Sequence, residues 1–283
     1  MADAFDHCEA LVREADKDRF LATLFAPAKP RRALHALYAF NIEILRVREA
    51  AREPLPGEIR LQWWRDVFAG AARGEVRANP VAAALLDVIV RYRLPIKRLT
   101  GLIDAHGFDL YDDPMQTLEE LEAYAASTSA TVMELAALIL AGRSDASATM
   151  AARHAGIGQA TATLLRAFGL HAARRQLYVP LDILARHRAN VEDVFAGKAT
   201  PELRAALAEL RQHARTHLDA ARRAMVQVPE AAAPAFLPAA VARPLLDRME
   251  RRRYDPFRRT NFPTWRRQWI LWRAARKGLG NVL

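Results

Sequence analysis

The sequence predicts an all-α fold, a single-domain helical bundle built from 283 residues. Apolar residues recur at i, i+3, i+4 and i+7 almost throughout, and no alternating run typical of strands is found. Glycine is scarce, at 12 residues, whereas prolines mark many of the joints between the periodic segments. Because no internal repeat or low-complexity linker interrupts this pattern, one domain covering residues 1–283 is the economical prediction.

Prolines separate most of the predicted helices, since a proline inside a helix removes a hydrogen bond and clashes with the preceding turn. Pro80 and Pro95 each stand directly before a predicted helix. Thr117 followed by Glu120 is typical of a capping box. Gln227–Ala240, with three prolines among alanines, is the one segment that resembles a loose connection. In chain order, the predicted helices are Asp6–Leu24, Arg31–Arg52, Glu58–Ala72, Val81–Tyr92, Ile96–Leu110, Leu118–Ala141, Ala146–Phe168, Leu181–Arg188, Glu202–Val226, Leu237–Arg253 and Thr264–Lys277.

The distribution of apolar residues predicts which helices are central. The segments Ala33–Ala51, Leu121–Ala141 and Ala155–Phe168 are apolar around much of their circumference, which is typical of helices in the middle of a bundle. The helix at Glu202–Val226 is strongly charged. We therefore expect it at the periphery.

Composition and the N-terminal residues narrow the expected location. Cys8 is the single cysteine, which excludes a disulfide framework and a cysteine-based zinc site. The most apolar stretch, Ala123–Ala141, is interrupted by Ser127 and Glu134, so no transmembrane helix is expected. The start has neither a basic region nor a transit-peptide pattern, so no signal peptide is expected either. These features predict a cytoplasmic protein.

Positive charge is concentrated in the C-terminal segment 248–283. The net charge is +10, and residues 248–277 alone hold eleven Lys/Arg and two acids. Aromatic residues recur at helical spacing in this segment, and cations flank one side of their stripe. The stripe consists of Phe262, Trp265, Trp269 and Trp272. The flanking cations are Arg266, Arg273 and Lys277.

Three interpretations of this basic, Trp-rich segment stay open. The tryptophans can pack onto the bundle as core, leaving a basic outer rim. They can instead dock a membrane or a partner, because indole rings sit at the headgroup level and cations meet anionic lipids. Nucleic-acid binding rests on this segment alone and is the least favoured. The docking candidates are Trp265, Arg266, Trp269, Trp272 and Arg273.

A series of landmarks between Phe20 and Leu184 resembles the squalene/phytoene synthase family. In family order they are Arg19–Pro27, Ala36–Phe40, Leu94-Pro95, Leu102–Leu110, Thr117–Tyr124, Leu165-Arg166 and Ala173–Pro180. The resemblance implies an isoprenoid-synthase fold around a central cavity. It also implies head-to-head joining of two prenyl diphosphates, which uses two pairs of aspartates at i and i+4 to grip Mg²⁺.

This sequence departs from the family at those aspartates. The first pair falls on Leu45 and Glu49, and the second on Ala167 and His171, so one carboxylate is left of four. No acidic residue occurs between Asp145 and Asp182, so a shift of the alignment does not restore the second pair. We therefore predict no metal site and no cofactor, with Mg²⁺ expected only if the chain is an enzyme after all. Glu49 is equally explained as a salt-bridge partner of neighbouring arginines on its helix, Arg46 or Arg52.

The segments Asn41–Glu49 and Gly57–Arg65 resemble one branch in particular, the non-catalytic members similar to the mitochondrial complex I (NADH dehydrogenase) assembly factor. This resemblance implies a pseudoenzyme that acts in assembly or scaffolding at the membrane surface. Its expected partners are respiratory-chain subunits or the inner-membrane surface, where it would be peripheral. The alternative is a divergent prenyltransferase of isoprenoid biosynthesis that condenses two prenyl diphosphates.

The resemblance also implies cavity residues. Basic residues that face diphosphate in the enzymes persist here, so the cavity is a candidate site for an anionic lipid or a prenyl-phosphate-like ligand. The arginines are equally explained as partners of a helix C-terminus and its free carbonyls. The cavity and anion-binding candidates are Tyr38, Asn41, Tyr124, Arg166, Arg174, Arg175 and Tyr178.

Overall fold

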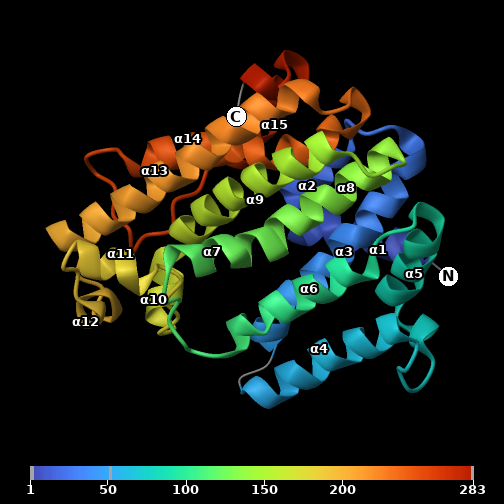
Figure 1. The fold of residues 1–283 in the computed structure, drawn as a ribbon, viewed down its shortest axis with the longest axis horizontal. Coiled ribbons are helices and arrows are strands. Elements are labelled where there is room, and N and C mark those ends of the chain that lie inside the picture. Colours follow the sequence, from blue (N-terminus) through green and yellow to red (C-terminus); the bar gives the residue numbers. More distant parts are fainter. Residues whose placement is uncertain (1–2, 51–52, 282–283) are drawn as a thin grey trace. The chain divides into compact units, whose positions relative to one another are not determined.

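The computed structural model describes residues 3–50 and 53–281, and every regular element within these ranges is helical (Figure 1). The all-α prediction is therefore confirmed. The described residues form two compact units. The first unit comprises Met1–Tyr111, Thr131–Thr149 and Gln227–Pro238, and the second comprises Asp112–Ala130, Met150–Val226 and Ala239–Leu283.

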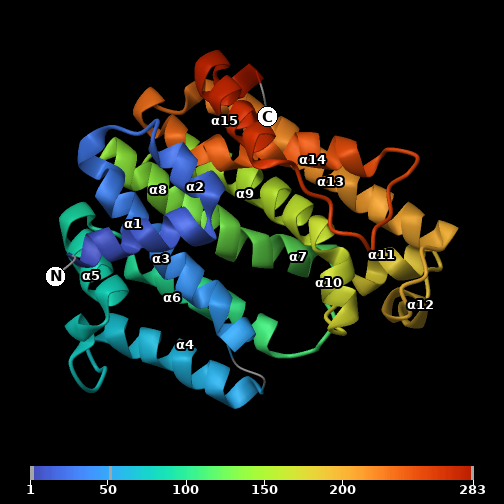
Figure 2. The ribbon, with the colours of Figure 1, turned by 180° about the vertical axis from the view of Figure 1, so that it is seen from behind.

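The two views of the ribbon label the α-helices (Figures 1 and 2). The α-helices are α1 (Ala4–Ala15), α2 (Lys17–Thr23), α3 (Ala28–Ala50), α4 (Pro54–Ala69), α5 (Pro80–Tyr92), α6 (Ile96–His106), α7 (Leu118–Ala125), α8 (Thr131–Ala141), α9 (Ala146–Arg166), α10 (Phe168–Ala173), α11 (Leu181–Arg186), α12 (Val191–Phe195), α13 (Pro201–Ala224), α14 (Ala242–Met249) and α15 (Thr264–Lys277). The 3₁₀ helices are η1 (Val76–Ala78), η2 (Phe108–Leu110), η4 (Met225–Gln227), η5 (Glu230–Val241) and η6 (Leu279–Asn281), and η3 (Ala126–Ala130) is a π-helix.

α1 and α2 divide the segment that was predicted as one helix, Asp6–Leu24. The Asp16 carboxylate accepts a hydrogen bond from the backbone amide of Arg19 at 3.0 Å and pairs with the Arg19 guanidinium at 3.0 Å. An aspartate in this position satisfies an amide that the first turn of a helix leaves without a backbone partner. The chain therefore ends one helix and starts another at Asp16, although its apolar spacing continues.

α3 is the central helix of the first unit. It contacts α1, α5 and α8 and is buried along most of its length, as its apolar circumference predicts. The Phe40 ring packs edge-on against Trp64 of α4, with 4.8 Å between the ring centroids, and lies 5.6 Å from the ring of Phe68. These aromatic contacts fix α4 against α3.

His35 of α3 should make the stability of the chain depend on pH. Its side chain is 1% exposed, and its Nε2 lies 3.0 Å from the Thr23 hydroxyl. Burial lowers the pKa of His35 below its ordinary value of 6.5, mainly because a charged imidazole would lose its hydration. Below about pH 6.5 the unfolded chain takes up a proton that the folded chain resists, so stability is lost as pH falls.

Between pH 7.5 and 5.5 the free energy of unfolding should fall, by no more than about 1.4 kcal/mol per pH unit from this one histidine. Urea unfolding at several pH values measures the slope, and the His35→Gln variant should show a shallower one. Equal slopes in the variant and the parent chain would contradict this assignment.

The second unit contains α13, which was predicted to be peripheral. Thr200 caps it, because its hydroxyl oxygen accepts a hydrogen bond from the amide of Leu203 at 3.2 Å. One face of the helix is buried through Leu203, Leu207 and Leu210, and charged residues occupy the rest. α13 is thus an amphipathic helix with one covered face.

Several predicted boundaries were wrong. The segment expected as a loose connection, Gln227–Ala240, contains the 3₁₀ helix η5, and Phe236 within it is buried. Pro234 and Pro238 lack the amide hydrogens of a regular α-helix, so this stretch winds in shorter turns. The helix predicted at Leu237–Arg253 is accordingly shorter, as α14. The short helices α10 and α12 were not predicted.

The capping box predicted before α7 is half formed. The hydroxyl oxygen of Thr117 accepts a hydrogen bond from the amide of Glu120 at 3.2 Å. The Glu120 carboxylate, however, accepts one from the amide of Gln116 at 2.8 Å, one residue before the position that a capping box uses. The start of α7 was nevertheless predicted correctly.

One helical stretch, Leu118–Ala141, passes a length and composition test for crossing a membrane. It joins α7, η3 and α8. Within its most apolar window, 56% is buried inside the structure, and the core helix of a globular protein passes the same test. This stretch is therefore weak evidence for a membrane span.

Candidate functional site

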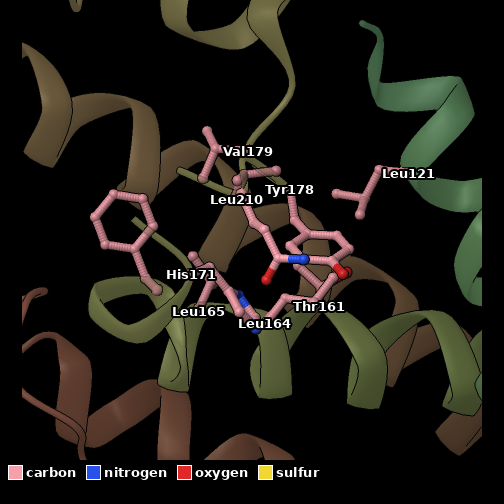
Figure 3. A pocket seen from close by; sticks show the side chains of 10 residues that line it. Leu121, Thr161, Leu164, Leu165, His171, Tyr178, Val179 and Leu210 are labelled. Atoms are coloured by element: carbon pink, nitrogen blue, oxygen red, sulfur yellow. The ribbon is translucent and has the colours of Figure 1, made fainter. Parts of the chain in front are cut away.

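A small cavity in the second unit is lined by two of the predicted site residues, His171 and Tyr178 (Figure 3). Its cavity volume is about 20 Å³. That is little more than one water molecule requires. The lining residues are Leu121, Thr161, Leu164, Leu165, Phe168, His171, Gln176, Tyr178, Val179 and Leu210.

The loop between α10 and α11 carries one wall of this cavity. It is held beside the start of α7 by two backbone hydrogen bonds. The amide of Met115 donates to the carbonyl of Leu177, and the amide of Leu181 donates to the carbonyl of Met115, each at 3.0 Å. These bonds fix Gln176 and Tyr178 where they line the cavity.

Two predicted residues, His171 and Tyr178, line this cavity, and a third, Tyr124, lies beside Tyr178. The His171 ring lies 4.7 Å from the Tyr178 ring, and the Tyr178 ring lies 5.9 Å from that of Tyr124, measured between centroids. Figure 3 shows His171 and Tyr178 at the same cavity. The resemblance named Tyr124 and Tyr178 as cavity candidates and His171 as a position of the second motif, and the structure brings the three rings next to one another.

The lining residues do not fit a magnesium–diphosphate clamp. None of them carries a carboxylate, and most are apolar. Mg²⁺ requires oxygen ligands, commonly carboxylates together with substrate phosphates. His171 offers a nitrogen, and Ala167 is the N-cap residue of α10 with no side-chain ligand to offer. No catalytic step through such an ion is therefore derived for this cavity.

The three candidate arginines lie outside the cavity lining. Arg166 donates a hydrogen bond from Nη1 to Asn261 Oδ1 at 3.4 Å. Arg174 is the C-cap residue of α10 and is exposed. Arg175 is exposed, with its guanidinium 4.4 Å from the centroid of the Phe195 ring and 3.7 Å from the Glu192 carboxylate. Arg174 and Arg175 therefore occupy the end of a helix, which was the alternative explanation for them.

In the first unit, α3 carries the other candidates. Tyr38 and Asn41 are buried, whereas Leu45 is exposed. The guanidinium of Arg19 lies 5.4 Å from the centroid of the Tyr38 ring. Burial raises the pKa of Tyr38 well above its ordinary value, so this phenol stays protonated at neutral pH.

Glu49, the one surviving carboxylate of the expected aspartates, is exposed near the end of α3. The salt bridge suggested for it with Arg52 lies outside the described residues. With Leu45 on the same helix, this position offers one carboxylate where the family pattern has two. The remnant of the first motif is therefore a poor cation site as well.

α15 carries an exposed aromatic surface, hereafter the Trp face, which consists of Trp265, Trp269 and Trp272. Their exposed fractions are 68%, 51% and 49%. Arginine guanidinium groups lie 5.3 Å from the Trp269 ring and 5.4 Å from the Trp272 ring. The helix is held to its unit by the opposite side, where Ile270, Leu271 and Ala274 are buried. The core interpretation of these tryptophans was therefore wrong, and of the aromatic stripe only Phe262 is buried.

Two polar lining residues of the cavity, Thr161 and Gln176, were not singled out from the sequence. The Thr161 hydroxyl donates to the carbonyl of Ile157 at 2.9 Å, one turn back along α9. Gln176 directly precedes Leu177 and Tyr178, so its place in the landmark Ala173–Pro180 was the available signal.

Comparisons with known proteins show which proteins this chain resembles. The squalene/phytoene synthase family model matches residues 12–273. The complex I assembly factor 6 of Rattus norvegicus, an NADH dehydrogenase (ubiquinone) assembly factor, is 31% identical over 90% of this chain and 76% of its own length. The 15-cis-phytoene synthase of Synechococcus elongatus is 25% identical over 94% of this chain and 91% of its own length.

A solved structure extends the likeness to the fold. Squalene synthase HpnC from Alicyclobacillus acidocaldarius matches with a TM-score of 0.77 at 24% identity, covering 90% of this chain and 95% of its own. Identity at this level supports the fold alone. The isoprenoid-synthase type predicted from the landmarks is thereby confirmed.

Proposed function

This chain belongs to the squalene/phytoene synthase family, and from that premise we propose that it is a non-catalytic member that assists assembly of respiratory complex I at a membrane surface. The observation that carries the proposal is the likeness to complex I assembly factor 6 across 90% of the chain, at higher identity than the phytoene synthase reported above. Fold alone would not distinguish the two, because one fold serves many functions.

The state of the motif positions supports a non-catalytic role. Ionising a prenyl diphosphate inside an apolar cavity requires cations that neutralise the leaving diphosphate. Leu45, Ala167 and His171 do not supply the carboxylates that would hold those cations, and the lining of the second-unit cavity has none. The same cavity has room for little more than a water molecule, so it does not accept a prenyl chain as it stands.

The Trp face supports a place at a membrane surface. Three large indoles at i, i+4 and i+7 are exposed on one side of α15, and the segment around them carries eleven Lys/Arg and two acids. Indoles favour the headgroup region, and cations favour anionic lipids. We propose that this face docks onto an anionic bilayer, so that the protein is peripheral on the membrane that holds the respiratory chain.

Removing this chain from its own host should lower the amount of assembled, NADH-oxidising complex I, and re-expression should restore it. Native gel electrophoresis of the membranes with an NADH-oxidation stain measures that amount, and other respiratory complexes serve as internal controls. Unchanged complex I would contradict the assembly role.

A turnover assay tests the alternative function, a divergent prenyltransferase. The purified chain with Mg²⁺ and farnesyl or geranylgeranyl diphosphate should form no condensation product. A product whose formation EDTA abolishes would instead identify a divergent prenyltransferase, and the non-catalytic assignment would then fail.

A further inference from the structure

Three side chains with metal-binding atoms converge in the second unit, outside the cavity described above. Glu122 comes from α7, and His213 and His217 come from α13, where their i, i+4 spacing places them on one face. The ligand atoms of all three lie within 4.8 Å of one another. α7 and α13 are labelled in Figures 1 and 2.

The distances between these atoms match the edges of a coordination tetrahedron. Glu122 Oε1 lies 3.2 Å from His213 Nε2 and 3.5 Å from His217 Nε2. A tetrahedral ion with bonds of about 2.0–2.1 Å has ligand atoms separated by about 3.3–3.4 Å. A single ion therefore fits between the carboxylate oxygen and either imidazole nitrogen with shifts of a few tenths of an ångström.

Hydrogen bonding alone does not account for the arrangement. Nε2 of His213 is buried and makes no hydrogen bond within the described part of the chain, although the Glu122 oxygen is 3.2 Å away. A buried ring nitrogen without a partner carries a free-energy cost, because it has lost its contact with water. An ion in line with its lone pair would remove that cost.

The position of His154 of α9 also favours a metal ion at these residues. Its Nδ1 lies 3.1 Å from Nδ1 of His217, on the side of that ring away from Glu122. If the Nδ1–H of His217 donates to His154, the Nε2 of His217 keeps its lone pair for an ion. Metal-binding histidines are commonly fixed in this way by a hydrogen-bond acceptor on the other nitrogen.

The site is open to solvent at its carboxylate. Glu122 remains 30% exposed, which leaves a route for an ion and for a water ligand.

We propose that Glu122, His213 and His217 form a binding site for a divalent transition-metal ion of the zinc type, with water completing the shell and His154 orienting His217. Two imidazoles and one carboxylate suit such an ion and not Mg²⁺, which prefers oxygen ligands throughout. The ion would link α7 to α13. The prediction of no metal site rested on the missing aspartates of the family pattern, and Glu122, His213 and His217 lie outside that pattern.

Zinc titration of the tag-free chain tests the proposal. After dialysis against a chelator, the protein should bind one Zn²⁺ per chain in competition with a chromophoric chelator, and Mg²⁺ should not displace it. Co²⁺ in place of Zn²⁺ should give the visible bands of a tetrahedral site. His213→Ala and His217→Ala should each weaken binding at least about tenfold, and His154→Gln by about tenfold as a supporting residue.

His187→Gln is the matched control, because His187 pairs with a carboxylate of α13, Glu209, at 2.6 Å without a second imidazole. It should leave Zn²⁺ affinity unchanged. Glu122→Gln keeps the side-chain shape and should also weaken Zn²⁺ binding about tenfold or more. This variant tests the metal site even if an alanine variant fails to fold. A wild-type chain that binds no Zn²⁺, or variants that bind as tightly as the wild type, would overturn the proposal.

Discussion

Replacing Trp265, Trp269 and Trp272 together by alanine is expected to lower binding to anionic lipid vesicles by roughly a hundredfold. The three rings expose about half or more of their surface on one side of α15. Partial burial of each ring in the headgroup region is worth on the order of 1 kcal/mol, from about 25 cal/mol per Å² of apolar surface covered. Three rings thus contribute about 3 kcal/mol, which is roughly two orders of magnitude in the partition coefficient.

The triple substitution should leave the fold intact. A stable variant that no longer binds vesicles would show that the tryptophans dock a membrane and do not hold the fold together. The side of α15 that holds it in place consists of Ile270, Leu271 and Ala274, which the substitutions leave untouched. Exposed residues away from special contacts usually change the free energy of unfolding by less than about 0.5 kcal/mol. Co-sedimentation with vesicles measures binding, and urea unfolding of the same samples measures stability.

Leu55→Ala with Ile59→Ala provides a matched control on α4, because these side chains are 69% and 63% exposed and lie in the other unit. This pair should leave vesicle binding unchanged. Binding of the parent chain should weaken with added salt and on neutral lipid, since arginines beside the tryptophans contribute about 1 kcal/mol each near an anionic surface. Retained binding in the triple tryptophan variant would rule out the Trp face as the docking surface.

The helices that the sequence predicted well are those with clear local signals at their ends. α5 and α15 were predicted within one residue, because Asn79-Pro80 and Pro263 mark their starts and the apolar spacing is regular between the boundaries. The break at Asp16 and the short helices α10 and α12 were missed. Elements of five or six residues have too few turns to display a period, and the surrounding structure decides whether they form.

The candidate site was predictable only where residues lie near one another in the chain or match a family landmark. His171 is a position of the second motif and Tyr178 belongs to the nearby landmark Ala173–Pro180, and the structure brings their rings together. Glu122 and His213 lie on different helices far apart in the sequence, so only the fold reveals their contact. The i, i+4 spacing of His213 and His217 was a usable signal, but the carboxylate that completes the cluster comes from another helix, α7.

Gly156→Ala should destabilise the second unit by about 1–3 kcal/mol. A Cβ built on Gly156 of α9 would lie 2.3 Å from the Cα of Ala130 and 2.4 Å from its amide nitrogen. These are backbone atoms at the end of the π-helical turn η3, so no side chain can rotate away and the two helices must separate. The gain in helix propensity, about 0.5–1 kcal/mol, offsets only part of that cost.

Gly101→Ala tests the same substitution without the close approach. Gly101 lies within α6, and a Cβ built there meets nothing within 4 Å. Only the propensity gain remains, so this variant should be more stable than the parent chain by about 0.5–1 kcal/mol. Urea unfolding of both variants should therefore give shifts of opposite sign. If Gly156→Ala were also more stable than the parent chain, α9 would have room beside Ala130, and the contact between η3 and α9 would not be as close as the glycine requires.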